Sequence, residues 1–248
     1  MSAPEYSQTF LEPRVAHAYE QFYEAGTADE AIWKFERKFL SEFYDRNAPG
    51  WPRCSYLDYA CGTGRVIAFL EGRPVRSVGI DVSPEMLKIA RTKVRRSELF
   101  CCDLTSDATV GDKYDLITAF RFFLNAEPNM RLGVLKALAV RLRNENSRLV
   151  FNNHGNPWSI KAIAWPIHRV RQWLRGRETA GNYLTHSEVE SLVAAANLRI
   201  VERTGCGLLS PRLFRLAPSV LGEFEARAGG GKLARAAGVN QIYVVARR

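Results

Sequence analysis

The chain has 248 residues, a formal net charge of +9, 46% hydrophobic residues and 25% charged residues. This composition is typical of a folded globular chain. It holds no apolar run of about 18 residues, which argues against a membrane-spanning helix. Its five cysteines contain no Cys-x-x-Cys pair and its four histidines show no metal-ligand spacing. We therefore expect no structural metal, no disulfide framework and a reducing cytoplasmic location.

The N-terminus has neither a basic start nor an apolar core, so it does not predict a signal peptide. The positive charge indicates either an anionic partner or an ordinary basic surface. Residues 1–50 show two amphipathic helical patterns separated by Gly26. We interpret them as an N-terminal helical cap, in which Tyr19 is a candidate ligand contact. Residues 51–248 would form the second unit.

From residue 54 the pattern alternates between apolar runs and helical segments. Unbroken apolar runs favour a parallel sheet with helices on both faces. Ser83 and Thr185 are the expected N-caps of two of the helices. The predicted strands are 54–59, 77–81, 99–102, 114–120, 148–153, 198–203 and 241–246, and the predicted helices between them are 64–71, 84–94, 129–142 and 186–196.

Two inserts interrupt this alternation. Residues 156–182 are basic and contain tryptophans. This insert could lie on an anionic membrane, face an acidic substrate, or simply cover the sheet. Residues 205–238 are rich in Gly, Pro, Leu and Arg, and we expect a mobile substrate lid.

Three acids follow three successive strands: Asp58, Asp81 and Asp103. The carboxyl ends of parallel strands line the crevice where ligands bind. Asp81 could hold two ribose hydroxyls and Asp103 could accept from an adenine amino group. The ring itself could lie between Val82 and Met86, so the pattern predicts a nucleoside cofactor.

The turn after the first strand contains Gly62 and Gly64, which allow sharp turns and close approach of a ligand. A dinucleotide site would have a third glycine where this chain has Ile67. Asp58 would also repel a pyrophosphate. It suits a ligand with an ammonium group and a positive centre, such as S-adenosylmethionine.

At residues 57–64 the sequence LDYACGTG resembles the first motif of the class I S-adenosylmethionine-dependent methyltransferases. The resemblance continues through VGIDVSPEML at 78–87, CDL at 102–104 and YDLI at 114–117. It implies an α/β, Rossmann-like, seven-stranded, mostly parallel sheet whose final strand is antiparallel. It covers residues 54–154 well and the remainder in outline.

The resemblance also implies roles for individual residues. Gly62 and Gly64 would approach the methionine part of the cofactor, with Asp58 beneath it. The Leu104 backbone would contact adenine and Phe120 would lie near the methyl group. The family usually has glycine where this chain has Ala60, which we expect to keep a negative φ in a slightly altered loop.

Methyl transfer is an in-line displacement, so positioning of the acceptor supplies much of the rate. His154 is the candidate general base, or alternatively a loop cap. Arg121 could bind an anionic acceptor or pair with a carboxylate, and Asn125 could orient the acceptor or cap a helix. We expect a small-molecule, glycan or lipid-linked acceptor rather than nucleic acid. The alternatives are a nucleotide-dependent oxidoreductase of similar fold and a non-catalytic S-adenosylmethionine-binding or RNA-binding protein.

Overall fold

A computed structural model describes residues 13–21, 23, 26–104, 112–160, 183–209 and 216–248. The chain forms a seven-stranded sheet of order β3-β2-β1-β4-β5-β7-β6. Neighbouring strands are parallel except for β7, which runs antiparallel to β5 and β6. The strands are β1 (Ser55–Tyr59), β2 (Arg76–Asp81), β3 (Glu98–Cys101), β4 (Leu116–Ala119), β5 (Arg148–Asn153), β6 (Leu198–Cys206) and β7 (Asn240–Arg247).

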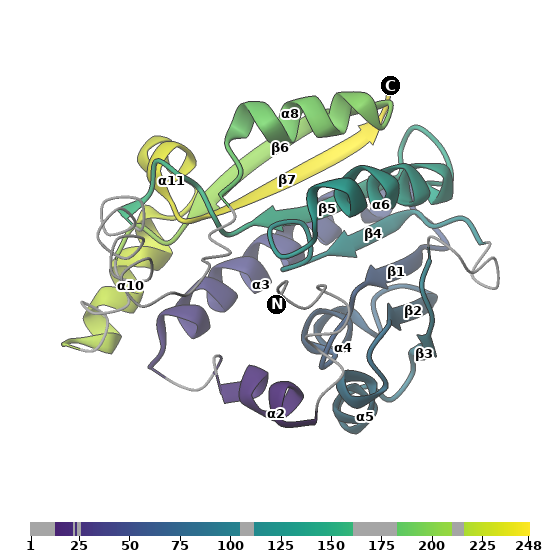
Figure 1. Ribbon diagram of the computed structural model, residues 1–248, viewed down its shortest axis with the longest axis horizontal. Helices are drawn as coiled ribbons and strands as arrows, with labels where there is room; N and C mark the ends of the chain where they lie inside the picture. Colours follow the sequence, from purple (N-terminus) through teal and green to yellow (C-terminus); the bar gives the residue numbers. More distant parts are fainter. Residues whose placement is uncertain (1–12, 22, 24–25, 105–111, 161–182, 210–215) are drawn as a thin grey trace, which may run out of the picture.

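Helices cover both faces of the sheet (Figure 1). On one face α6 and α8 enclose a core with Phe151 and Tyr243. On the other face α3, α4 and α5 enclose a core with Leu40 and Val150. The helices are α2 (Pro13–Gln21), α3 (Ala28–Asn47), α4 (Arg65–Leu70), α5 (Pro84–Lys93), α6 (Pro128–Arg141), α8 (His186–Ala195), α10 (Pro218–Ala228) and α11 (Lys232–Ala237), and a short 3-10 helix, η1 (Ala48–Gly50), follows α3.

The strand order reverses between β1 and β4, and ligands of open α/β sheets bind at such a point. The chain goes outward from β1 to β2 and β3, and then returns to place β4 on the other side of β1. This topology confirms the predicted sheet, including its antiparallel last strand. It leaves the carboxyl ends of β1 and β4 next to each other beneath the N-terminal helices.

Local signals set several helix boundaries as predicted. Ser83 accepts from the Met86 N–H at 3.2 Å, and Pro84 opens α5. Thr185 and Glu188 form a reciprocal capping box at the start of α8. Each bond satisfies a backbone donor that the first turn of a helix leaves without a partner.

Some strand boundaries differ from the prediction. Strand β4 begins at Leu116 rather than 114, since Tyr114 makes only an isolated bridge to Leu142. Strand β6 continues to Cys206 because β7 pairs with it along that length. The described residues of the predicted lid at 205–238 include α10 and α11. Most of the 156–182 insert lies outside the described residues, and so does part of 205–238.

No helix in the described part of the chain is both long enough and apolar enough to cross a membrane.

Candidate functional site

The loop between β1 and α4 contains three residues with positive φ. These are Ala60 at 52°, Gly62 at 55° and Gly64 at 79°. A Cβ added to Gly64 would lie 2.9 Å from the Ala90 Cβ, so this glycine lets α4 approach α5. A Cβ added to Gly62 would meet no atom within 4 Å, so this part of the loop borders open space. The loop therefore has the tight path and the free face that a bound ligand needs.

Ala60 adopts the left-handed conformation, so the expectation of a negative φ was wrong. The physical reason is the path of the backbone that follows it. The Cys61 N–H donates to the Ile80 carbonyl at 2.9 Å, and the Gly62 N–H donates to Asp81 Oδ2 at 2.8 Å. These bonds to β2 stabilise the turn, at a cost of about 1 kcal/mol for an alanine at positive φ.

Asp58 lies in β1 directly beneath this loop, and its side chain is buried. Thr118 of β4 donates to its Oδ1 at 2.6 Å, and the Tyr56 hydroxyl lies 2.7 Å from the same Thr118 oxygen. Its Oδ2 is buried and accepts no hydrogen bond from the described residues. Burial raises the pKa of Asp58 to about 7, and the Thr118 hydrogen bond only partly opposes this.

Asp81 ends β2, and both of its carboxylate oxygens accept backbone N–H groups. Oδ2 accepts from Gly62 at 2.8 Å, and Oδ1 accepts from Ser83 at 2.9 Å. Burial raises its pKa, although these bonds oppose the shift. Asp81 therefore holds the glycine loop and the start of α5 together, and a carboxylate oxygen can accept a further bond from a ligand.

The other candidate adenine contacts lie at the same edge of the sheet. Val82 is 37% exposed and Asp103 is exposed, whereas Met86 and Leu104 are buried. The Cys101 thiol donates to the Val82 carbonyl at 3.6 Å. The five cysteines form no disulfide; Cys101 is exposed, Cys102 is half-buried, and the remaining three are buried.

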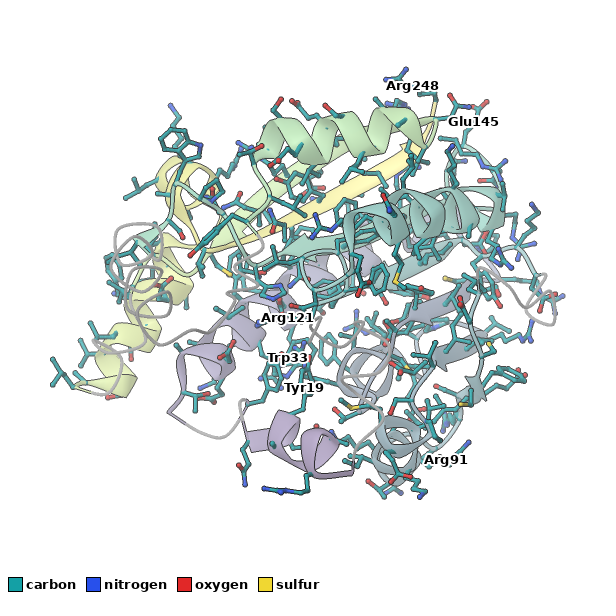
Figure 2. All side chains as sticks on the ribbon, viewed as in Figure 1. Tyr19, Trp33, Arg91, Arg121, Glu145 and Arg248 are labelled. Carbon is teal, nitrogen blue, oxygen red and sulfur yellow. The ribbon has the colours of Figure 1, made fainter. Side chains whose placement is uncertain are left out.

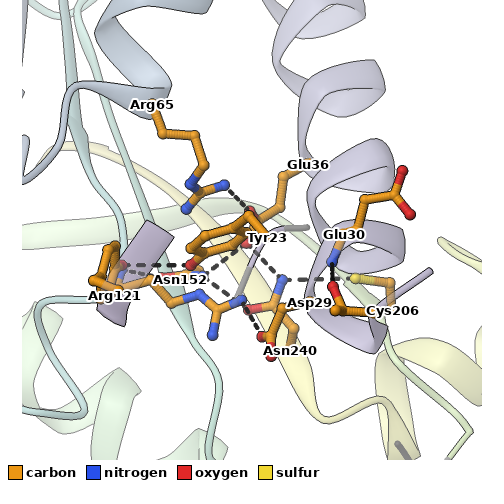
Figure 3. A network of polar contacts seen from close by, with 11 residues as sticks. Tyr23, Asp29, Glu30, Glu36, Arg65, Arg121, Asn152, Cys206 and Asn240 are labelled. Atoms are coloured by element: carbon orange, nitrogen blue, oxygen red, sulfur yellow. Dashed lines mark hydrogen bonds and ion pairs between the residues drawn. The ribbon is translucent and has the colours of Figure 1, made fainter. Parts of the chain in front are cut away.

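A second group of polar side chains lies across the switch point, where α3 meets β5 and β7 (Figure 3). At its centre is Glu36, which has no exposed surface. Its Oε1 accepts from the side-chain amides of Asn152 at 2.9 Å and Asn240 at 3.0 Å. Its Oε2 pairs with Arg65 at 3.1 Å. One carboxylate thus connects four separate segments of the chain.

Arg65 is the first residue of α4, directly after the glycine loop. Its guanidinium lies 4.1 Å from the ring centroids of both Tyr23 and Trp33. Burial lowers its pKa, but Tyr23 and Glu36 outweigh this effect, so the pKa stays above its usual value. The arginine is therefore a fixed cation that attaches the N-terminal helices to the glycine loop.

Arg121 follows β4 at a φ of 62°. Its backbone N–H donates to Asn152 Oδ1 at 2.6 Å, and its guanidinium pairs with Asp29 at 3.0 Å. The ring centroid of Tyr23 lies 5.7 Å from this guanidinium, and burial raises the pKa of the Tyr23 hydroxyl. Figure 3 shows Tyr23 between the two arginines.

The remaining predicted residues have the following places. Figure 2 shows Tyr19 and Arg121 in the region between the N-terminal helices and the sheet. The Tyr19 hydroxyl lies 3.4 Å from that of Tyr23. Phe120 is buried in the core beneath α3, and His154 is half-buried just past β5. Asn125 is exposed and donates to the Arg121 carbonyl at 2.7 Å.

The sequence analysis missed Glu36, Arg65, Asn152 and Asn240. A signal existed for two of them. Glu36 falls between Ile32 and Leu40 at four-residue spacing, which places a carboxylate on the apolar face of its helix. Asn152 follows three apolar residues in a strand whose last five residues are all buried. A polar residue on a buried face needs a partner, so both positions pointed to a buried polar contact.

One groove of the described structure is separate from this site. A groove of about 410 Å³ opens beside α11 and the start of β7, lined by residues including Trp158, His186 and Tyr243. It contains none of the predicted site residues. Among the described residues, no group of three His, Cys, Asp or Glu side chains is placed to hold a metal ion.

Comparisons with known proteins agree with this geometry. A family described as "Methyltransferase domain" matches residues 57–145. The magnesium protoporphyrin IX methyltransferase of Synechocystis PCC 6803, solved with bound SAH, superposes with a TM-score of 0.66 at 13% identity, over 98% of this chain and 97% of that chain. No curated protein sequence matches.

Two further solved structures are similar over nearly their whole length. An S-adenosylmethionine-dependent methyltransferase of Clostridium acetobutylicum ATCC 824 has a TM-score of 0.60 at 16% identity, covering 93% of this chain and 98% of that one. The plantazolicin methyltransferase, solved with SAH, has a TM-score of 0.61 at 18% identity, covering 98% of this chain and 94% of that one. Residues 57–145 therefore match a methyltransferase domain, and the strand order and these superpositions give the whole chain the Rossmann-like fold of the class I S-adenosylmethionine-dependent methyltransferases.

Proposed function

We propose that this enzyme transfers a methyl group to an oxygen or nitrogen of a small-molecule, glycan or lipid-linked acceptor. The observation that carries the proposal is the buried carboxylate of Asp58. One of its oxygens has no hydrogen-bond partner among the described residues, and it lies beneath a loop whose Gly62 borders open space. Burial of an acid is costly, Thr118 and Arg65 offset only part of that cost at Asp58, and a cationic ligand above it would reduce the cost further.

The residues of the cofactor half fit S-adenosylmethionine. Asp58 would face its positively charged methionine part, and Gly62 with Gly64 would line that part of the site. Asp81 would accept from the ribose hydroxyls, and Asp103 with the Leu104 backbone would contact adenine between Val82 and Met86. When bound, the sulfonium supplies an already activated methyl group.

The chain's own task is then to position the acceptor and to remove its proton. We place the acceptor beside Phe120, between Arg121 and His154, where β4 and β5 end. His154 would take the proton from an acceptor hydroxyl, and Arg121 would hold a negatively charged group. Residues 1–50, including Tyr19, would cover the bound molecules, because α3 already contacts both halves of the site through Glu36.

The kind of acceptor is proposed from the surroundings of the site. Structural neighbours include methyltransferases named for magnesium protoporphyrin IX, mitomycin and plantazolicin. A small molecule suits a site covered by helices, and an anionic one suits the net charge of +9. We further propose a cytoplasmic enzyme in which the insert at 156–182 is the segment for any membrane contact.

Titration calorimetry tests the proposal directly. The full chain should bind S-adenosylmethionine in a one-to-one complex and give no heat with the reduced nicotinamide cofactor. No binding of S-adenosylmethionine would overturn the proposed function. A screen of cell extracts, in which methylated products are detected by mass spectrometry, would then identify the acceptor.

The role of His154 needs a separate measurement. His154→Ala should lower turnover by about 10²-fold or more, as expected for loss of a general base, while cofactor affinity stays within about twofold. His186→Ala is the matched control, because its ring stacks on Tyr243 outside the candidate site. Normal methylation by the His154 variant would make this histidine structural.

A further inference from the structure

The Arg121 guanidinium uses only part of its hydrogen-bonding capacity. Its Nη2 donates to Asp29 Oδ1 at 3.0 Å. Its Nε is buried, and no acceptor for it exists among the residues that the structure describes. A buried donor without an acceptor costs about 1–3 kcal/mol, more when the group is charged. The edge of the guanidinium that carries Nε and Nη2 is therefore half satisfied.

The two partners of this ion pair differ in how firmly they are held. The backbone of Arg121 is fixed by the hydrogen bond from its amide N–H to Asn152 Oδ1 at 2.6 Å, and the Arg121 side chain is 13% exposed. The Asp29 side chain is 36% exposed and lies in the first turn of α3. Asp29 is therefore the partner that can turn toward solvent without unfolding the site.

The charges of the cluster limit what can replace Asp29. Glu36 and Asp29 are two carboxylates, and Arg65 and Arg121 are two guanidinium groups. Exchange of one carboxylate for another leaves this balance unchanged. A neutral ligand in the same place would leave Arg121 as an uncompensated buried charge, which is strongly unfavourable. A dianionic phosphate would add a negative charge to the cluster.

We propose that Asp29 occupies the position in which a carboxylate group of the methyl acceptor binds. The acceptor carboxylate displaces Asp29 and binds Arg121 through both Nε and Nη2. The planar Nε–Nη2 edge of arginine matches a carboxylate in two parallel hydrogen bonds, whereas Asp29 makes one. The acceptor is thus a molecule with a free carboxylate, used as its anchoring group. This inference relies on the proposed function only for identifying the bound molecule as the methyl acceptor.

The test measures binding of a simple carboxylate to the full chain without cofactor. Benzoate is titrated into the wild-type protein and into Asp29→Asn, with benzamide and phenylphosphonate as neutral and dianionic probes of similar shape. Removal of the competing carboxylate should strengthen benzoate binding at least about tenfold, or about 1.4 kcal/mol. Benzamide should not bind, and phenylphosphonate should bind more weakly than benzoate.

Two further variants locate the effect. Adding Arg121→Gln to Asp29→Asn should abolish benzoate binding. Asp45→Asn breaks a comparable pair with Arg73 elsewhere and should leave benzoate affinity at the wild-type value. The proposal is overturned if Asp29→Asn, shown to be folded by circular dichroism, binds benzoate no better than wild type, or prefers phenylphosphonate.

Titration of S-adenosylmethionine into the same samples separates this inference from the proposed function. If the cofactor binds but benzoate affinity does not respond to Asp29→Asn, only the carboxylate position is wrong. If benzoate behaves as expected but the cofactor does not bind, the carboxylate position remains and the proposed function fails.

Discussion

The proposed cofactor half of the site, at the glycine loop, and the proposed acceptor half, around Glu36 and Arg121, are constructed in different ways. In the cofactor half, one loop and the ends of β1 and β2 supply the groups, and most bonds are made by backbone N–H groups to Asp81. In the acceptor half, side chains from α3, α4, β5 and β7 meet at Glu36. Few of these partners are neighbours in the sequence.

This contrast separates a locally encoded site from one that exists only in the folded chain. Backbone geometry sets the cofactor half, so substitutions there should change ligand binding more than folding. Buried charges set the acceptor half, so substitutions there should change folding strongly. Substitutions at Glu36 and Asp81 test this distinction, and substitutions at Asp58 and Ala60 test two stability effects within the cofactor half.

The largest effect is expected at Glu36. Glu36→Ala leaves Arg65 without its carboxylate and removes the acceptor of two amides, so the free energy of unfolding should fall by about 3–5 kcal/mol. Urea denaturation measures it. Glu42→Ala on the same helix is the control, because that side chain is 67% exposed and should change stability by less than about 0.5 kcal/mol. Equal losses in both variants would contradict the central role of Glu36.

Asp58 should give a large effect that depends on pH. Its folded pKa of about 7 lies above the usual 3.8, so the folded state holds the proton more tightly. The contribution of this proton to the free energy of unfolding is complete below pH 3.8. It is lost as pH rises to about 7, at about 1.4 kcal/mol per pH unit. Denaturation of the unliganded protein at several pH values should show this fall, and Asp58→Asn should remove it.

The same carboxyl predicts how cofactor binding depends on pH. A cationic ligand favours ionised Asp58, so affinity should increase up to about pH 7 and binding should release a proton near that pH. Calorimetry in two buffers with different ionisation enthalpies measures the proton. Identical heats in both buffers would show that Asp58 does not face the positive charge.

Asp81→Ala should weaken S-adenosylmethionine binding by about 1–3 kcal/mol, because it removes an acceptor for the ribose and releases the Gly62 N–H. Calorimetry measures the affinity. Glu85→Ala, in the first turn of the next helix, is the control because its carboxylate pairs with the exposed Lys88. Unchanged affinity of the Asp81 variant would mean that the ribose binds elsewhere.

The smallest effect is expected at Ala60, where the sign is the informative result. Ala60→Gly should raise the free energy of unfolding by up to about 1 kcal/mol, because glycine accepts a positive φ without strain. Ala68→Gly lies inside α4 and should lower it by about 0.5–1 kcal/mol. Thermal denaturation compares the two, and a decrease for both would show that Ala60 is not strained.

The sequence was sufficient for the sheet and for several helix boundaries. The caps at Ser83 and Thr185 and the apolar strands are local signals, and they predicted their elements correctly. Ala60 was misjudged because the residue type permits a negative φ, while the bonds of the next two residues to β2 do not. A local pattern cannot show that tertiary requirement.

The acceptor half was predicted only in part. Arg121 was expected to pair with a carboxylate or an anionic acceptor, and it pairs with Asp29. Nothing in the sequence connects Glu36 with Asn240, which lies 204 residues further on. Such a contact follows from strand order, because β7 is inserted beside β5 only in the assembled sheet.

The exposed Cys101 is a position at which the protein can be labelled selectively. It is the last residue of β3, and it is exposed whereas the other four cysteines are buried or half-buried. Burial raises the pKa of Cys54 to about 12 and the pKa values of Cys61 and Cys206 above the usual range. Thiol-reactive dyes need an accessible thiolate, so they should label this position first. Because its thiol contacts the Val82 carbonyl, a fluorophore on Cys101 would report whether the proposed adenine-binding end of the site is occupied. This measurement needs no assay for the acceptor.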